Sequence, residues 1–278
     1  MASISGGSGE GTLSFIGIEG RDHLLCERIR ARCAIQSGSV HGAIHDILGL
    51  SLLKSKAIPF SIVTNITLPT SKKDLFMLLS SPGSSLKGVE DLRGQEIALS
   101  SHTIAEYVTD SLLSLKRVKI EEVTKMEVKK IPLRVQMLME GKVKAATLPE
   151  PLASLAVFQG AKKLGGDYGL KGTQVVFVFQ ELFMRRESEA MIRLGKAYAQ
   201  AVRMINQDPL QWRELLVEKG RLPSPIKDVY TMNPFSDIQI PRPEETQAVK
   251  IWMDGKGFET SKITHSSLVN DIWVKGVR

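Results

Sequence analysis

Cysteine, aromatic residues and long apolar runs are all scarce in this sequence. Only two cysteines occur among 278 residues, Cys26 and Cys33. On one helix their Cα atoms would be about 10 Å apart, beyond the reach of a disulfide. Without matching histidine or cysteine partners they also form no metal site. Nothing approaches the roughly 18 consecutive apolar residues of a membrane span. We therefore expect neither a disulfide scaffold, nor a metal centre, nor a transmembrane helix.

Positive charge exceeds negative charge but is scattered along the chain. The net charge is +7, yet the densest basic run, KRVK at 116–119, is followed at once by Glu121 and Glu122. Aromatic residues make up only 6% of the chain, and no basic tract has them interleaved. Nucleic acid is therefore not an expected partner. The charge favours acidic ligands at most mildly.

The first twelve residues, MASISGGSGEGT, are rich in glycine and serine. They contain neither a basic start nor an apolar core, so they do not read as a signal peptide. Such a composition predicts a disordered tail over residues 1–12. Taken literally, the chain would stay in the cytoplasm.

The stretch Gln95–Leu115, QEIALSSHTIAEYVTDSLLSL, carries the clearest structural signal. Apolar residues alternate in its first part, as a strand requires, and then recur at helical spacing. Thr103 and Glu106 have the spacing of a capping box, which starts a helix. The polar turn Ser100–Thr103 is therefore expected beyond the carboxyl end of a strand, where α/β proteins often bind ligands. Most such turns bind nothing, so the turn alone does not establish a site.

The rest of the chain alternates between strand and helix signals up to Phe179 and is mostly helical from Ser188 onward. We expect strands at 13–18, 40–44, 60–64, 74–79, 125–131, 143–148 and 174–179. We expect helices at 21–36, 46–53, 132–140, 151–158, 190–206, 209–219 and 244–255, with a last segment at 265–274. Residues 80–88, 165–172 and 221–243 are expected to be loops.

A short internal repeat divides this α/β pattern into two similar lobes. At a constant offset of 103 residues, Gly38, Val40 and Ala43 recur as Gly141, Val143 and Ala146. In both places a helix ends at glycine, a short apolar strand follows and a new helix begins. Two lobes of about 80 residues, with a ligand between them, are the simplest interpretation. Lobe 1 has too few residues ahead of Gly38, so we expect its first strand–helix unit to be missing or compressed.

Four segments together carry a family resemblance: SGSVHGAIHDILG, LRGQEIALSSHTIAEYVTDSLL, MLMEGKVKAATLPEPLASLA and AYAQAVRMINQDP. Their order and spacing resemble the solute-binding proteins of ABC importers of the NitT/TauT (NMT1/THI5-like) type. The resemblance implies the periplasmic binding protein type 2 fold. Lobe 1 would comprise 13–84 and 175–278, with the C-terminal helices packed on it, and lobe 2 would comprise 85–174.

The beginning of the chain departs from this family. Members carry an export signal and are periplasmic proteins or cell-surface lipoproteins. They also begin with a strand and helix that help to line the ligand site. Here a Gly/Ser tail and the Arg- and Cys-containing stretch 19–32 stand instead. A truncated or frame-shifted start and a divergent member both fit this departure.

The resemblance places several loops against the ligand. They contain His45 and Asp46, the turn Ser100, Ser101, His102 and Thr103, then Pro149 and Glu150, and more weakly Thr64 and Asn65. For Asp46, capping its own helix is favoured over ligand contact. Thr103 is expected to be used in capping, which leaves Ser101 and His102 as the better candidates. Glu150 either accepts a hydrogen bond from the ligand or favours a helix N-terminus.

The function implied by the resemblance is binding, not catalysis, without a cofactor or metal. A monomer would capture a small anionic or polar solute by closing its lobes and deliver it to an ABC permease. Sulfonates, nitrate and precursors of pyrimidines or thiamine are the solutes the resemblance suggests.

Two other functions stay open at this point. Related NMT1/THI5-type synthases make a pyrimidine precursor from a histidine and pyridoxal phosphate, and His41, His45 and His102 formally allow this. However, no lysine or phosphate cradle, dinucleotide motif, P-loop or nucleophile elbow is recognisable. The effector domain of a regulator has the same fold, but no helix-turn-helix precedes it here.

Overall fold

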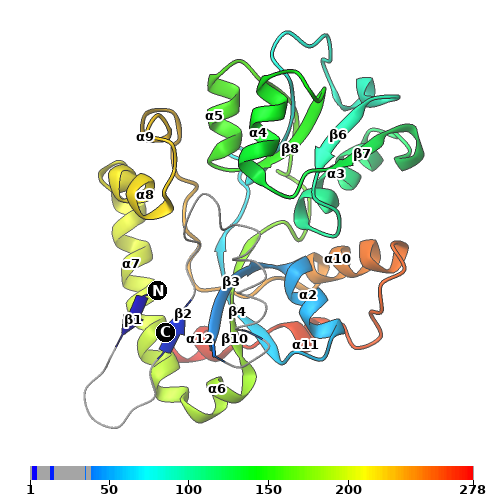
Figure 1. Cartoon of the computed structure of the whole chain (residues 1–278). Helices are drawn as coiled ribbons and strands as arrows, with labels where there is room; N and C mark the ends of the chain where they lie inside the picture. Colours follow the sequence, from blue (N-terminus) through cyan, green and yellow to red (C-terminus); the bar gives the residue numbers. More distant parts are fainter. Residues whose placement is uncertain (1, 5–12, 16–34, 36–38, 278) are drawn as a thin grey trace. The chain divides into compact units, whose positions relative to one another are not determined.

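A computed structural model describes residues 2–4, 13–15, 35 and 39–277 of the chain. The chain folds into two compact units of the α/β class, as the sequence predicts (Figure 1). Unit 1 comprises 1–68, 174–209 and 234–278, and unit 2 comprises 69–173 and 210–233. The chain therefore passes between the units four times.

The units differ from the expected lobes in two ranges. Residues 69–84 and 210–233 belong to unit 2, whereas lobe 1 was expected to include both. For 69–84 the reason lies in strand pairing: β5 (Phe76–Ser80) lies inside the sheet of unit 2, between β8 and β9. A local sequence pattern identifies this strand but not its neighbours.

Unit 1 is built on a mixed sheet with the strand order β1-β2-β3-β10-β4. These strands span Ala2–Ile4, Leu13–Phe15, Gly42–Asp46, Val175–Gln180 and Phe60–Thr67 respectively. Strand β10 lies between β3 and β4 and runs antiparallel to both. Consequently β3 and β4 are parallel to each other, and their carboxyl ends lie at the same edge of the sheet.

Helices cover the sheet of unit 1 and enclose an aromatic core. The helices are α2 (Ile47–Ser55), α6 (Glu181–Arg186), α7 (Ser188–Gln207), α10 (Pro243–Gly255), α11 (His265–Leu268) and α12 (Ile272–Gly276). Trp273 on α12 is fully buried and packs edge-on against Phe177 of β10, with ring centroids 5.6 Å apart. Val63, Phe179 and Met191 belong to the same cluster. The returning C-terminal helices thus complete the core of unit 1.

Unit 2 is built on a second mixed sheet with the order β7-β6-β8-β5-β9. Besides β5, its strands are Thr124–Glu127 (β7), Glu96–Leu99 (β6), Ala145–Pro149 (β8) and Lys162–Gly166 (β9). Strand β6 runs parallel to both β7 and β8, whereas β5 runs antiparallel to β8 and β9. The carboxyl ends of β6, β7 and β8 therefore lie at one edge.

Helices pack on both faces of the unit 2 sheet (Figure 1). One face is covered by α3 (Ile104–Leu115), where Thr109 and Thr147 share a hydrogen bond of 2.6 Å. The other face is covered by α4 (Ile131–Met139) and α5 (Leu152–Phe158), over an alanine- and leucine-rich cluster. The remaining elements of the described residues are the 3-10 helices η1 (Val89–Leu92), η2 (Ile120–Glu122) and η3 (Pro209–Trp212) and the helices α8 (Arg213–Gly220) and α9 (Ile226–Val229).

The internal repeat has a counterpart in the two sheets. The bounds of β3 and β8, Gly42–Asp46 and Ala145–Pro149, differ by 103 residues, which is the offset found in the sequence. Each of these strands has a parallel neighbour on one side and an antiparallel neighbour on the other. In unit 1 the parallel neighbour is β2, which pairs with β3 through Phe15 and Gly42. A three-residue strand thus stands where the first unit of lobe 1 was expected to be missing or compressed.

Other expectations for the N-terminal region fall mostly outside the described residues. Within the tail expected to be disordered, Ala2–Ile4 forms β1 and pairs antiparallel with β2. The described part does not include the remaining tail residues or either cysteine. It also does not include the expected helix at 21–36, apart from Ile35. Among the described helices, none combines the length and apolar character needed to cross a bilayer.

Candidate functional site

In unit 1 the four candidate residues lie on the two strands that flank β10. Val176 of β10 pairs with His45 on one side and with Asn65 on the other. Asp46 and Thr64 are the adjacent residues of β3 and β4. Thr64 and Asn65 were expected to stand at the end of their strand, but β4 continues to Thr67. The shared register with β10 brings Asn65 level with His45, about 20 positions earlier in the sequence.

Asp46 caps the helix that follows it. It occupies the N-cap of α2 with extended backbone, and its Oδ1 accepts a hydrogen bond of 2.7 Å from the N–H of Gly49. The favoured interpretation of Asp46, capping, is thus confirmed. His45 accepts a hydrogen bond of 3.0 Å from the Asp46 N–H through Nδ1 and lies over Gly49, where a Cβ would collide with its ring. Both side chains are only partly buried.

Thr64 and Asn65 are buried and hold a returning segment of the chain. The Asn65 N–H donates to the carbonyl of Gln239 at 2.7 Å, and the Gln239 N–H donates to Thr64 Oγ1 at 3.1 Å. Asn65 Oδ1 is buried and has no hydrogen-bond partner within the described part of the chain. Gln239 was missed by sequence reasoning because nothing in the local pattern signals a partner so far along the chain.

In unit 2 the polar turn and the Pro149–Glu150 loop lie at the same sheet edge. Strand β6 ends at Leu99, just before the turn Ser100–Thr103, and the parallel strand β8 ends at Pro149. Strand β7 ends at Glu127, which pairs with Leu99 in the register of the sheet. The topology therefore assembles three polar strand ends side by side.

The capping of α3 differs from the sequence prediction. Thr103 is the N-cap residue, but its side chain makes no cap; its Oγ1 donates to the carbonyl of Ser100 at 2.7 Å. Glu106 accepts a hydrogen bond of 2.6 Å from the N–H of His102, one residue ahead of the N-cap. The reason is the left-handed backbone of His102, φ 58°, which turns its N–H toward the helix. The predicted capping box was therefore wrong in its partners, although the helix begins where expected.

A second carboxylate, that of Glu127 at the end of β7, binds the same turn. Glu127 Oε2 accepts a hydrogen bond of 2.7 Å from the N–H of Ser101, and Ser100 Oγ lies 3.5 Å from Glu127 Oε1. The buried Glu106 is also held by Lys125, whose Nζ lies 2.8 Å from Oε1. Sequence reasoning missed Glu127, because the strand was expected to continue to residue 131 and no polar end was visible. The N–H groups of Ser101 and His102 and the hydroxyl of Thr103, which could otherwise receive an anion, are thus already used.

Glu150 stands at the start of α5 and is held there by that helix. Its Oε1 accepts 2.7 Å from Ser154 Oγ and its Oε2 accepts 3.1 Å from the Ser154 N–H. Burial raises the pKa of the Glu150 carboxyl, while the Ser154 hydrogen bonds and the charge of Lys73 pull it back. The N–H of Glu150 donates to the carbonyl of Leu75 at 2.8 Å. Glu150 therefore favours the helix N-terminus, one of the two roles expected of it.

Arg134 hydrogen-bonds to the backbone at this edge of the unit 2 sheet. This guanidinium on α4 is buried and donates to the carbonyl of Val128, at 2.7 Å from Nη2, and to that of Thr147, at 2.8 Å from Nη1. It thereby ties the end of β7 to β8. A buried arginine on a predicted helix gives no sequence signal that distinguishes it from a surface one.

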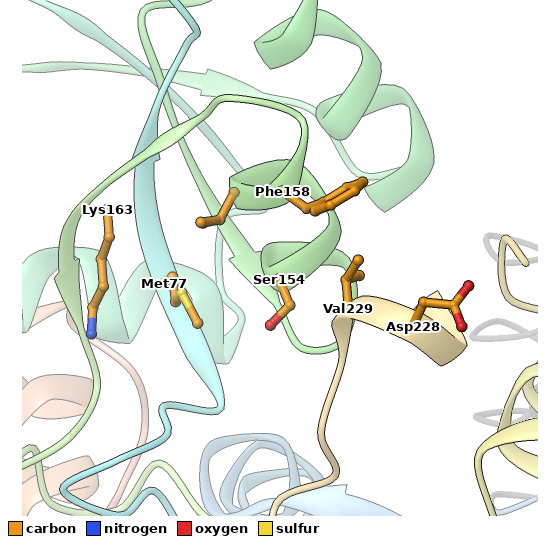
Figure 2. A pocket seen from close by; sticks show the side chains of 7 residues that line it. Met77, Ser154, Phe158, Lys163, Asp228 and Val229 are labelled. Atoms are coloured by element: carbon orange, nitrogen blue, oxygen red, sulfur yellow. The ribbon is translucent and has the colours of Figure 1, made fainter. Parts of the chain in front are cut away.

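Unit 2 also contains a shallow pocket beside Glu150, with a volume of about 440 Å³ (Figure 2). Its lining is mostly apolar and comes from β5, α5, β9 and α9: Met77, Ser154, Val157, Phe158, Lys163, Asp228 and Val229. Ser154 belongs both to this wall and to the hydrogen bonds of Glu150. None of the sequence-predicted site residues lines the pocket.

The histidines of the enzymatic alternative are divided between the two units. His41 and His45 belong to unit 1 and His102 to unit 2. His41 packs against Phe183, with ring centroids 4.4 Å apart. Within the described residues, no group of three histidine, cysteine or acidic side chains could hold a metal ion.

The sequence profile of the NMT1/THI5-like family matches residues 28–211. The chain belongs to this family. No curated protein sequence is similar enough to count as a relative of this NMT1/THI5-like chain. Its fold is that of the SsuA-type periplasmic binding proteins, as the sequence resemblance predicts.

Solved structures with this fold include two sulfonate-binding proteins and an enzyme. The aliphatic sulfonate-binding protein SsuA from Escherichia coli has a TM-score of 0.75 and 16% identity, over 87% of this chain and 79% of that one. SsuA from Xanthomonas axonopodis pv. citri, bound to MOPS, has a TM-score of 0.72 and 18% identity, over 85% and 82%. The desulfurization enzyme DszB has a TM-score of 0.64 and 10% identity, over 85% and 84%. At these identities the likeness shows a shared fold.

Proposed function

We propose that this NMT1/THI5-like protein captures a small polar solute and delivers it to the permease of an ABC importer. The observation that carries the proposal is the placement of the candidate residues. His45 and Asp46 in unit 1, and Ser100–Thr103 with Pro149 and Glu150 in unit 2, lie at or just beyond the carboxyl ends of strands, while Thr64 and Asn65 lie within β4. The carboxyl ends of strands are where α/β proteins bind their ligands.

Binding fits the side chains at these edges better than catalysis. The carboxylates of Asp46 and Glu150 serve the first turns of helices, and Thr64 is buried against Gln239. Such groups fix the shape of a strand end and leave it to offer hydrogen bonds to a solute. The fold itself is shared by binding proteins and by DszB, so the proposal rests on the edges rather than on the fold.

The same proposal extends to partners and location. A solute-binding protein of an importer works outside the cytoplasm, as a monomer in the periplasm or at the cell surface, and docks on a membrane permease. The structural neighbours named as periplasmic binding proteins support this assignment.

A thermal-shift screen tests the proposal with sulfonates, nitrate, thiamine precursors and amino acids as probes. At a concentration one hundred times its Kd, a bound solute should stabilise the protein by about 2.7 kcal/mol. That increment should fall in Glu150→Gln, which changes the strand end of β8. It should persist in Glu140→Gln, an exposed position at the end of α4. If no compound in the screen raises the melting temperature, the proposed function is overturned.

A further inference from the structure

The turn at the start of α3 has donors that would suit an anion, but the chain itself occupies them. The Ser101 N–H is bound by Glu127 and the His102 N–H by Glu106, at 2.7 and 2.6 Å. The Thr103 hydroxyl donates to the Ser100 carbonyl. A helix N-terminus attracts anions because its N–H groups lack partners. Here two carboxylates bind the N–H groups of Ser101 and His102, just ahead of the N-cap Thr103.

The two carboxylates differ in what they offer to a solute. Glu106 is buried and paired with Lys125. Glu127 is exposed at the end of β7, and it has no cationic side chain as a partner among residues 39–277. An exposed carboxylate fixed by a backbone N–H keeps acceptor capacity for a second donor. Glu127 therefore presents negative charge at the edge where the solute is proposed to bind.

We propose that Glu127 makes the unit 2 edge selective for solutes that donate hydrogen bonds, cationic or neutral, over anions such as sulfonates. This inference rests on the proposed function and names its substrate class. The ligand would place an ammonium, amidinium, amide or ring N–H against Glu127. An anion at the same place would meet this carboxylate and would find the Ser101 and His102 N–H groups taken.

Positive charges nearby do not reverse this preference. Lys125, two residues before Glu127 on β7, is held between Glu106 and Asp110. Lys129 and Lys130 follow on the exposed chain after Val128 and are solvated. Their charge acts on any anion through water, where it is strongly screened. The carboxylate at the turn acts by direct contact, so it dominates the selection.

The test uses three small probes of similar size: methanesulfonate, acetamide and acetamidinium. Amide resonances of Ser101, His102 and Glu127 are followed by nuclear magnetic resonance during titration, which measures binding in the millimolar range. We expect saturable shifts with acetamidinium or acetamide at concentrations at least tenfold below those needed for methanesulfonate. In Glu127→Gln, which keeps an acceptor for the Ser101 N–H, the preference for acetamidinium over methanesulfonate should fall at least tenfold.

Glu96→Gln is the matched control, because Glu96 is an exposed residue at the opposite end of β6. It removes the same charge and should leave the preference unchanged. The inference is overturned if methanesulfonate binds the unaltered protein more tightly than the other two probes do. It is also overturned if Glu127→Gln and Glu96→Gln show the same preference for acetamidinium over methanesulfonate. Either result leaves the proposed function standing. Absence of saturable shifts with all three probes also overturns the inference. The thermal-shift screen then decides the proposed function separately.

Discussion

At the residue scale, Asp167 shows how burial couples one side chain to pH. This carboxyl lies just after β9, is fully buried, and accepts hydrogen bonds from the N–H groups of Leu75 and Phe76 at 2.8 and 3.2 Å. Burial raises the pKa of Asp167 from 3.8 to about 6, even though the two backbone hydrogen bonds lower it. The folded protein therefore binds this proton more tightly than the unfolded chain does.

The sign of the pH effect follows from that difference. Between about pH 4 and pH 6 the native state holds more of this proton than the unfolded state, so raising the pH lowers the free energy of unfolding. Two pKa units correspond to roughly 3 kcal/mol. Asp167→Asn keeps an oxygen for Leu75 and Phe76 but cannot ionise. We expect the free energy of unfolding of Asp167→Asn, relative to that of the unaltered protein, to rise by about 2–3 kcal/mol from pH 4 to pH 7.5. Urea unfolding at several pH values measures this difference.

The matched control is Asp228→Asn, which removes an exposed carboxylate of the same unit. Its stability should follow that of the unaltered protein across this pH range. Parallel curves for Asp167→Asn and the unaltered protein would mean that Asp167 ionises in the folded state as easily as in the unfolded one.

At the scale of the element, the end of α3 carries local strain that a single substitution relieves. Arg117 follows the C-cap in the left-handed region, with φ 54°, and its N–H donates to the Ser114 carbonyl at 3.0 Å. The N–H of Val118 donates to the Leu113 carbonyl at 2.9 Å, which completes a Schellman-type ending. Glycine adopts this conformation without the steric cost of a Cβ.

In Arg117→Gly the relief of this strain should outweigh the extra conformational entropy that glycine gives the unfolded chain. The variant should therefore be more stable by about 0.5–1 kcal/mol. Thermal unfolding measures this as a higher melting temperature. Ser114→Gly, three residues earlier on the exposed side of the same helix, should instead destabilise by about 0.5–1 kcal/mol. If both glycine variants lower the melting temperature equally, the left-handed residue carries no relievable strain.

Elements with a strong local signal could be predicted, and those that depend on distant partners could not. The expected helix after Thr103 matches α3, and the strand expected at 60–64 is the first part of β4. Strand β9, KKLGG, was missed because two lysines and two glycines have little strand propensity. Its pairing with β5 imposes the conformation. Likewise, the turn Ser100–Thr103 was found from its pattern, whereas Glu127 became visible only through the register of β6 and β7.

At the scale of the whole molecule, the family and fold followed from the order of several degenerate segments, but the extents of the units did not. The membership of 69–84 in unit 2 depends on the antiparallel pairing of β5 with β8 and β9. Those partners lie some 70 to 90 residues further along the chain. Only a pairing between distant strands fixes such a boundary, and local periodicity does not contain it.

The same long-range pairing makes a prediction about where a solute acts. Residues 99–104, 126–129 and 148–151 are far apart in sequence but share the edge formed by β6, β7 and β8. A solute bound there should slow amide hydrogen exchange in all three segments together. Residues 116–123, between α3 and β7 at the amino ends of the strands, should exchange as before. Hydrogen-exchange mass spectrometry with the most stabilising compound of the screen measures this. Protection confined to 154–163 and 228–229 would instead place the solute in the pocket beside α5, because these segments line it and the strand ends do not.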